Sequence, residues 1–216
     1  MKRTLQRVKG LIGRSSRPEA RPGEKTAAYY DERYRSWEVR SYSQSPYYFL
    51  WAVIADRIRR DGLGRVLEIG CGAGLLASFL FELGLEHYLG FDFSPVAVEQ
   101  ARRNAPRGRF LVADARTTTA FDDFEHDIVI CTEVLEHIED DLGVVARIRP
   151  GRRCLASVPS FPYVSHVRHF RNAQEVVERY GRFFRSVDVM TLRGTKDPDD
   201  LFFLIDGIRN DSPTAG

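Results

Sequence analysis

Short apolar runs alternate with longer amphipathic stretches from residue 65 onward. The apolar runs predict strands at 65–69, 88–91, 109–112, 127–131 and 153–158, and the amphipathic stretches predict helices at 75–83, 94–104, 139–147 and 174–180. Strands that alternate with helices imply a parallel sheet covered on both faces. Two late strand patterns have no helical pattern between them, at 184–192 and 201–208. They predict an antiparallel hairpin that closes a mainly parallel α/β sheet.

A separate helical pattern precedes the first strand. Ser45-Pro46 resembles a helix start, and apolar residues at helical spacing follow until Asp61-Gly62. Five tyrosines of residues 29–48 could cap a ligand site, pack the first helix, or do both, namely Tyr29, Tyr30, Tyr34, Tyr47 and Tyr48. We therefore divide the chain into a basic tail (1–28), an N-terminal helical lid (29–63), the main domain (64–208) and a C-terminal tail (209–216).

Composition and charge exclude several classes of protein. The chain has 216 residues with 43% hydrophobic content, enough for one folded α/β domain. The net charge of +2 gives no sign of a nucleic-acid partner. Residues 1–22 carry seven basic side chains against Glu19 alone. They are either an unstructured basic tail or a segment that makes weak peripheral contact with an anionic membrane surface.

The three cysteines lie in apolar stretches, and they are too few for a disulfide scaffold. No apolar run reaches the length of a membrane span, and no secretory core follows the basic start. We therefore expect reduced thiols and a cytoplasmic location.

The strongest motif follows the first predicted strand, where glycines stand at 70, 72 and 74 before a helix. Glycine permits a tight turn and lets a ligand lie against the backbone. The free N–H groups at the helix start favour a polar or anionic ligand group. A dinucleotide fingerprint would need glycine at position 75, where this chain has leucine. The pattern therefore favours a ligand without a pyrophosphate.

Acidic residues end the next two strands. Asp92 lies twenty residues after Gly72, and Asp114 follows the third strand. Each alone could be a helix cap or a turn residue. Carboxyl ends of parallel strands border one crevice, however, where Asp92 could accept hydrogen bonds from ribose hydroxyls and Asp114 from an adenine amino group.

These residues together resemble the class I S-adenosylmethionine-dependent methyltransferases. The string Glu68-Ile69-Gly70-Cys71-Gly72-Ala73-Gly74 resembles their donor motif, and Asp92 and Ala113-Asp114 match their ribose-side and adenine-side acids. The resemblance covers residues 65–208 and implies a Rossmann-like, seven-stranded, mainly parallel sheet with helices on both faces and the closing antiparallel hairpin. It also implies S-adenosyl-L-methionine as the methyl donor. The implied donor-binding residues are Glu68, Gly70, Cys71, Gly72, Gly74, Asp92, Phe93, Asp114, Ala115 and Thr132.

A second cluster follows the fourth strand, in Cys131-Thr132-Glu133-Val134-Leu135-Glu136-His137. If this segment is helical, Glu133, Glu136 and His137 share one face. His137 could act as a general base on an acceptor hydroxyl. Alternatively, the three side chains could bind a divalent metal that activates the acceptor oxygen. The plain alternative is a solvated helix start.

This Glu-x-x-Glu-His string is similar to that of the ubiquinone-biosynthesis O-methyltransferases and of the small-RNA 3′-terminal 2′-O-methyltransferases. In both groups it is associated with a divalent cation, and the RNA enzymes add a later histidine. The resemblance therefore implies a divalent metal such as Mg, Mn or Zn in this chain. His166 or His169 could be that ligand or a base. Both lie in the loop 159–171, which combines aromatic side chains with polar and basic ones. Such a loop could line an acceptor pocket, or it could pack on the edge of the sheet.

The expected function is methyl transfer from S-adenosylmethionine, with O-methylation of a small molecule in a biosynthetic pathway. An N-methyltransferase or protein methyltransferase of the same fold is one alternative. Those that act on nitrogen often carry an Asn-Pro-Pro-Tyr-type string after the fourth strand, and this chain has Cys131-Thr132-Glu133-Val134 there. A non-catalytic S-adenosylmethionine-binding protein is the other alternative.

Overall fold

The computed structural model describes residues 23–37, 41–62 and 64–211. Its helices are α1 (Ala27–Arg35), α2 (Tyr48–Arg60), α3 (Leu75–Glu82), α4 (Pro95–Asn104), α5 (Ala120–Asp123), α6 (Asp141–Ala146) and α7 (Ala173–Tyr180), with 3₁₀ turns η1 (Tyr42–Gln44), η2 (Leu135–His137) and η3 (Gly181–Phe183). Its strands are β1 (Val66–Ile69), β2 (Tyr88–Asp92), β3 (Arg109–Val112), β4 (Ile128–Thr132), β5 (Arg153–Pro159), β6 (Phe184–Arg193) and β7 (Leu201–Arg209).

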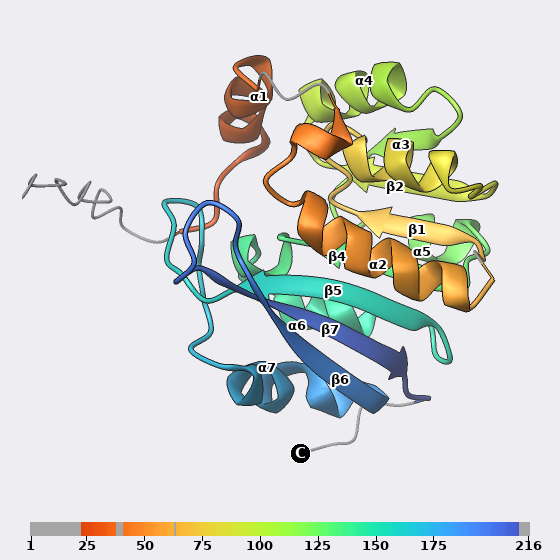
Figure 1. The fold of residues 1–216 in the computed structure, drawn as a ribbon. Coiled ribbons are helices and arrows are strands. Elements are labelled where there is room, and N and C mark those ends of the chain that lie inside the picture. Colours follow the sequence, from red (N-terminus) through yellow and green to blue (C-terminus); the bar gives the residue numbers. More distant parts are fainter. Residues whose placement is uncertain (1–22, 38–40, 63, 212–216) are drawn as a thin grey trace, which may run out of the picture.

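The strands form one twisted sheet in the order β3-β2-β1-β4-β5-β7-β6 (Figure 1). The five strands from β1 to β5 pair in parallel, and β7 runs antiparallel to both β5 and β6. The predicted mainly parallel sheet with a closing hairpin is therefore confirmed. The sheet order reverses between β1 and β4, and in open α/β sheets the ligand crevice lies at such a switch point.

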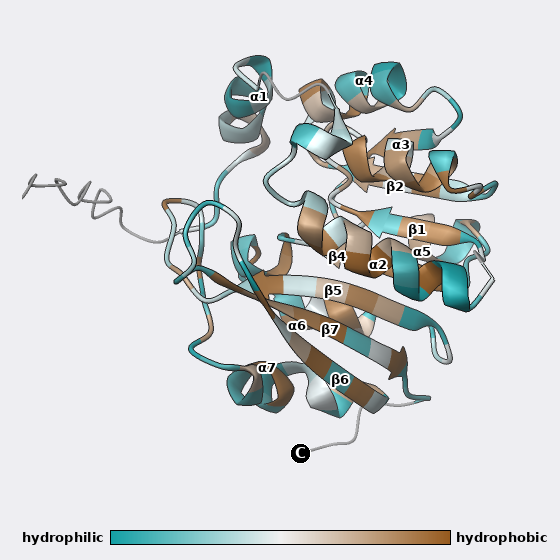
Figure 2. Cartoon of the chain, in the orientation of Figure 1, coloured by the Kyte–Doolittle hydropathy of each residue, from teal (hydrophilic) through white to brown (hydrophobic). Residues whose placement is uncertain are grey.

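Two apolar layers cover the sheet. Leu50 and Ile54 of α2 and Leu76 and Leu80 of α3 are fully or almost fully buried on one face. On the other face, α5, α6 and α7 contribute the buried residues Phe121, Val144, Val145, Val176 and Tyr180. The apolar colour concentrates on the strands and on the inner sides of these helices (Figure 2). Each fully buried side chain of this size contributes about 1.5–3 kcal/mol of transfer free energy.

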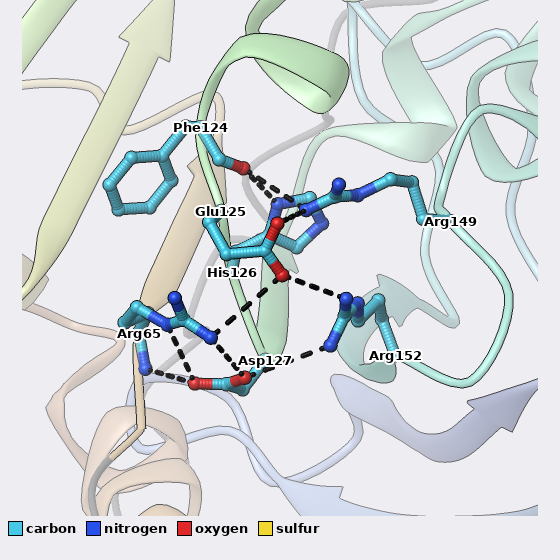
Figure 3. A network of polar contacts seen from close by, with 7 residues as sticks. All are labelled: Arg65, Phe124, Glu125, His126, Asp127, Arg149 and Arg152. Carbon is cyan, nitrogen blue, oxygen red and sulfur yellow. Dashed lines mark hydrogen bonds and ion pairs between the residues drawn. The ribbon is translucent and has the colours of Figure 1, made fainter.

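The amino ends of the strands are held by charged groups, as Figure 3 shows. Asp127, just before β4, accepts hydrogen bonds from the backbone N–H and the guanidinium of Arg65, just before β1. Glu125 pairs with Arg149 and Arg152, which lie before β5. These contacts fix the starts of three adjacent strands and leave their carboxyl ends free to build a site.

The N-terminal boundary differs from the prediction. Helix α1 begins at Ala27, inside the segment assigned to the tail, and Glu24 already makes specific contacts. None of the α1 residues is buried, so the helix does not pack an apolar face into the core. Its sequence therefore lacks the apolar periodicity by which a helix is predicted. The proposed role of residues 1–22 lies outside the described residues. Within those described, no helix is long and apolar enough to cross a membrane.

Candidate active site

A cavity of about 420 Å³ lies at the carboxyl ends of β1, β2, β3 and β4. Most of the predicted donor residues line it, namely Glu68, Gly70, Cys71, Gly72, Asp92, Phe93, Asp114, Ala115 and Thr132. These residues are far apart in the sequence and follow different strands. They meet because the carboxyl ends of parallel strands lie at the same edge of the sheet. Gly74 is the predicted donor residue that does not line the cavity.

The glycine-rich turn between β1 and α3 needs its glycines for conformation and for space. Gly70, Gly72 and Gly74 have φ angles of 67°, 50° and 73°, which disfavour any side chain. A Cβ on Gly72 would lie 2.6 Å from the hydroxyl of Tyr34, at the cavity wall. A Cβ on Gly74 would lie 2.8 Å from the Cα of Ala101 in α4. Gly74 therefore serves the packing of α3 on α4, which corrects its assignment to ligand contact.

Two buried carboxyls stand beside this turn. Asp92 accepts hydrogen bonds from the backbone N–H groups of Gly72 (3.0 Å) and Ser94 (2.9 Å), which fix its orientation. Glu68 accepts one from the hydroxyl of Tyr88 at 2.5 Å. Burial raises the pKa of Glu68 to about 8 and that of Asp92 to about 6. Both groups thus favour a ligand that brings positive charge or hydrogen-bond donors.

Asp114 is already paired. Its carboxylate accepts hydrogen bonds from Nε and Nη2 of Arg116, and these bonds lower its pKa. Glu24 bonds to the same guanidinium at 2.7 Å and accepts from the backbone N–H of Glu139 at 2.9 Å. The predicted adenine-side acid therefore belongs to a polar clasp of Glu24, Arg116 and Asp114, a feature that the sequence did not reveal.

Helix α1 lies over the cavity. Tyr30 and Tyr34 line the cavity, as does Tyr47, whereas Tyr48 packs on Tyr42 and Phe79 outside it. Asp31 accepts a hydrogen bond from the Oγ of Ser94 at 2.5 Å. This bond joins α1 to Ser94, whose backbone N–H donates to Asp92 at the end of β2.

Three side chains with metal-ligand chemistry converge at the other end of the cavity. One ligand atom from each of Glu136, His137 and His166 lies within 4.8 Å of the others. Oε1 of Glu136 is 3.5 Å from Nε2 of His137 and 4.0 Å from Nε2 of His166. Glu136 is fully buried, and neither of its carboxyl oxygens has a hydrogen-bond partner among the described residues. Burial, followed by the nearby Glu133, raises its pKa well above the usual range.

The two imidazoles are oriented by the backbone. Nδ1 of His137 lies 2.8 Å from the carbonyl oxygen of Ser165, and Nδ1 of His166 lies 3.0 Å from that of Phe161. Each Nδ1 therefore donates its proton to a carbonyl and leaves Nε2 unprotonated toward Glu136, as metal-bound histidines do. Burial lowers the pKa of His137, and it lowers that of His166 to about 4. A base that weak removes a hydroxyl proton poorly, so His166 suits a ligand role better.

Two predicted residues fall outside this group. Residues 135–137 form one 3₁₀ turn, and Glu133 precedes it at a φ of 55°, so no helix places Glu133 on the same face. Its carboxylate instead accepts a hydrogen bond from the Oγ of Ser157 at 2.7 Å. His169 is exposed and lies in a separate shallow depression with Glu175. The assignments of Glu133 to the metal group and of His169 to catalysis are therefore not supported by the geometry.

The loop after β5 divides between pocket and scaffold. Phe161, Tyr163 and His166 line the cavity, as the pocket interpretation expects. Arg168 instead donates to the carbonyl oxygen of Leu135 at 2.6 Å and steadies η2 from outside. Phe170 is buried in the core beside Tyr180. The cysteines also belong to the core: all three are buried free thiols.

Comparison with known proteins agrees with this geometry. Residues 67–155 match the family model described as a methyltransferase domain. The ubiquinone biosynthesis O-methyltransferase of Mesorhizobium japonicum is 39% identical over 114 residues, which cover 45% of this chain and 45% of that protein. The ribosomal protein L11 methyltransferase of Symbiobacterium thermophilum is 36% identical over 96 residues, covering 43% and 31%. The matches span less than half the length of these two curated relatives.

A solved structure extends the likeness to nearly the whole fold. The N-methyltransferase from Bradyrhizobium japonicum WM9, in complex with S-adenosyl-L-homocysteine, aligns with a TM-score of 0.64 at 19% identity, covering 85% of this chain and 99% of that one. The sheet order and the glycine-rich turn agree with the Rossmann-like fold of that structure. Residues 67–155 of the chain match a methyltransferase domain.

Proposed function

We propose that this chain transfers the methyl group of S-adenosylmethionine to a hydroxyl oxygen of a small acceptor in a biosynthetic pathway. The observation that carries the proposal is the buried, unpartnered carboxyl of Glu136 beside two oriented imidazoles, in the same cavity as the donor turn. A hydroxyl must lose a proton during transfer, and this group offers the means. The 39% identity to an O-methyltransferase over part of the chain supports the same choice.

On the donor side, the residues present suit S-adenosylmethionine, which supplies an electrophilic methyl group when it is bound. The backbone at Gly70 and Gly72 can approach the ligand closely because no Cβ intervenes. Glu68 and Asp92 offer carboxyl oxygens to its positively charged and hydroxyl groups. Tyr30 and Tyr34 of α1 also line the cavity, and exclusion of water there would strengthen these interactions.

On the acceptor side, Glu136, His137 and His166 suit a divalent cation such as Mg²⁺, Mn²⁺ or Zn²⁺. The orphaned oxygens of Glu136 and the two free Nε2 atoms are the donors that such a cation needs. A bound cation would lower the pKa of the acceptor hydroxyl as a Lewis acid. Without a cation, His137 would be the side chain placed to accept the proton.

Calorimetry tests both halves of the proposal. S-adenosylhomocysteine is titrated into chelator-treated protein, and Mg²⁺, Mn²⁺ and Zn²⁺ are titrated separately into wild type, Glu136→Gln and Glu139→Gln. We expect nucleoside binding in all three proteins and metal binding at least tenfold weaker in Glu136→Gln alone, because Glu139 is exposed. Methyl transfer to catechol, followed as S-adenosylhomocysteine formation, then reports turnover.

The outcomes separate the alternatives. Absence of nucleoside binding would overturn the methyltransferase proposal, and nucleoside binding without turnover on any acceptor would favour a non-catalytic binding protein. Equal metal affinity in wild type and Glu136→Gln would remove the cation from the mechanism.

A second candidate is methylation of nitrogen, in a small molecule or a protein. The partial likeness to the ribosomal protein L11 methyltransferase and the fold-level likeness to an N-methyltransferase motivate it. A neutral amine needs no base of its own to attack the methyl group. Turnover that is insensitive to Glu136→Gln and to chelation would favour this candidate.

A further inference from the structure

A guanidinium without an acidic partner stands at the acceptor end of the cavity. Arg33 of α1 lines the cavity, and its Cζ lies 5.4 Å from the ring centroid of Tyr163 and 5.8 Å from that of Tyr29. No ion pair joins Arg33 to a carboxylate in the described part of the chain, whereas Arg116, which also lines the cavity, pairs with Glu24 and Asp114. The two rings attract the cation without neutralising its charge.

The helical position of Arg33 directs it to the acceptor end. Tyr30 packs edge-on against His137, and Tyr34 lies against Gly72, so one face of α1 covers the site from donor turn to histidines. Arg33 contacts Tyr163, which belongs to the same loop as His166.

Several aromatic rings also stand at the acceptor end of the cavity. Phe161 and Tyr163 both pack against His166, with ring centroids 5.8 Å and 5.5 Å away, and Tyr30 packs against His137 at 5.8 Å. Such walls accept a flat apolar body, while a few placed polar groups fix its orientation. An arginine is suited to this orienting role because its planar fork binds a carboxylate through two hydrogen bonds.

We propose that the acceptor is a small hydroxylated aromatic acid, and that Arg33 binds its anionic group while the hydroxyl faces Glu136 and the histidines. This inference rests on the proposed function, because it names the acceptor of that same site. Lys196 also lines the cavity and would add to the attraction for an anion. Arg33 is thus a residue that determines acceptor specificity.

The test compares two probes that differ only in charge, 3,4-dihydroxybenzoate and 3,4-dihydroxybenzamide. Each is titrated into the full chain saturated with S-adenosylhomocysteine and Mg²⁺, for wild type, Arg33→Gln and the matched control Arg35→Gln, an exposed arginine of the same helix. We expect wild type and Arg35→Gln to bind the carboxylate at least tenfold more tightly than the amide, because a charge-assisted bond to Arg33 is lost with the amide. In Arg33→Gln the two probes should bind equally.

Each other result has a distinct meaning. Equal binding of both probes by wild type, or binding of neither, would overturn the proposed acceptor class. A loss of S-adenosylhomocysteine affinity of fivefold or more in Arg33→Gln alone would also overturn it, because Arg33 would then bind the amino-acid end of the donor. Failure of wild type to bind S-adenosylhomocysteine would instead contradict the proposed function itself.

Discussion

Replacement of Gly74 by alanine tests how the donor turn is built. Gly74 has a φ of 73°, and its added Cβ would lie 2.8 Å from the Cα of Ala101, a backbone atom of α4 that cannot turn aside. The left-handed backbone costs a residue with a side chain about 1–2 kcal/mol. Overpacking of a dense core costs about 1–3 kcal/mol more. We therefore expect Gly74→Ala to lower the free energy of unfolding by roughly 2–5 kcal/mol.

Gly151→Ala is the matched control. Gly151 has nearly the same φ, 75°, but no atom lies within 4 Å of its added Cβ. The difference between the two variants therefore isolates the crowding between α3 and α4, about 1–3 kcal/mol. Urea denaturation followed by circular dichroism measures both, and a thermal scan should separate them by about 2–4 °C for each kcal/mol. Equal destabilisation of the two variants would refute the close approach of α4 to the turn.

Two further predictions concern the donor end. Because burial raises the pKa of Glu68 to about 8, the folded state binds more protons than the unfolded state between about pH 4.5 and 8, and stability falls as pH rises through that window. Glutamine does not titrate, so Glu68→Gln should be more stable than wild type by on the order of 3 kcal/mol at pH 8 relative to pH 5. Urea denaturation of both proteins at pH 5 and pH 8 measures this difference in the free energy of unfolding. Glu24→Gln should weaken S-adenosylhomocysteine binding about two- to fivefold at low salt, because its half-exposed ion pair with Arg116 contributes at most about 1 kcal/mol. Calorimetry at two salt concentrations checks this, and a salt-independent loss would contradict an ionic role for the clasp.

The sheet and the donor turn were predictable from the sequence because their signals are local. Each parallel strand is a short, mainly apolar run, and the Gly70–Gly74 spacing marks one sharp turn that disfavours side chains. The closing hairpin followed from two strand patterns joined by a polar loop. Helix α1 was not predicted, because it packs on the domain through individual contacts, such as that of Asp31 with Ser94, and not through an apolar stripe.

The acceptor end was predictable only in its composition. The string from Glu133 to His137 shows two carboxyls and an imidazole close together in the sequence. The assumption of a helix wrongly placed Glu133 on the same face as Glu136 and His137. In the structure, the left-handed Glu133 turns its carboxyl to Ser157 of β5, a contact between residues far apart in the chain. The spacing in the sequence also did not distinguish His166 from His169. The distinction depends on the fold of the loop, in which the imidazole of His166 bonds to a backbone carbonyl at the cavity.

The charges around the cavity support the two ligands proposed above. The buried carboxyls of Glu68, Asp92 and Glu136 and the partly buried one of Glu133 face one space. Desolvation raises the pKa of Glu68, Asp92 and Glu133 to about 8, 6 and 7, and it raises that of Glu136 well above its usual range. Each ionised carboxyl there disfavours the folded chain unless positive charge lies beside it. The positively charged donor at one end and a divalent cation at the other would supply that charge. The same burial that destabilises the empty site therefore strengthens the attraction for the ligands that complete it, since a low-dielectric cavity amplifies every charge–charge contact.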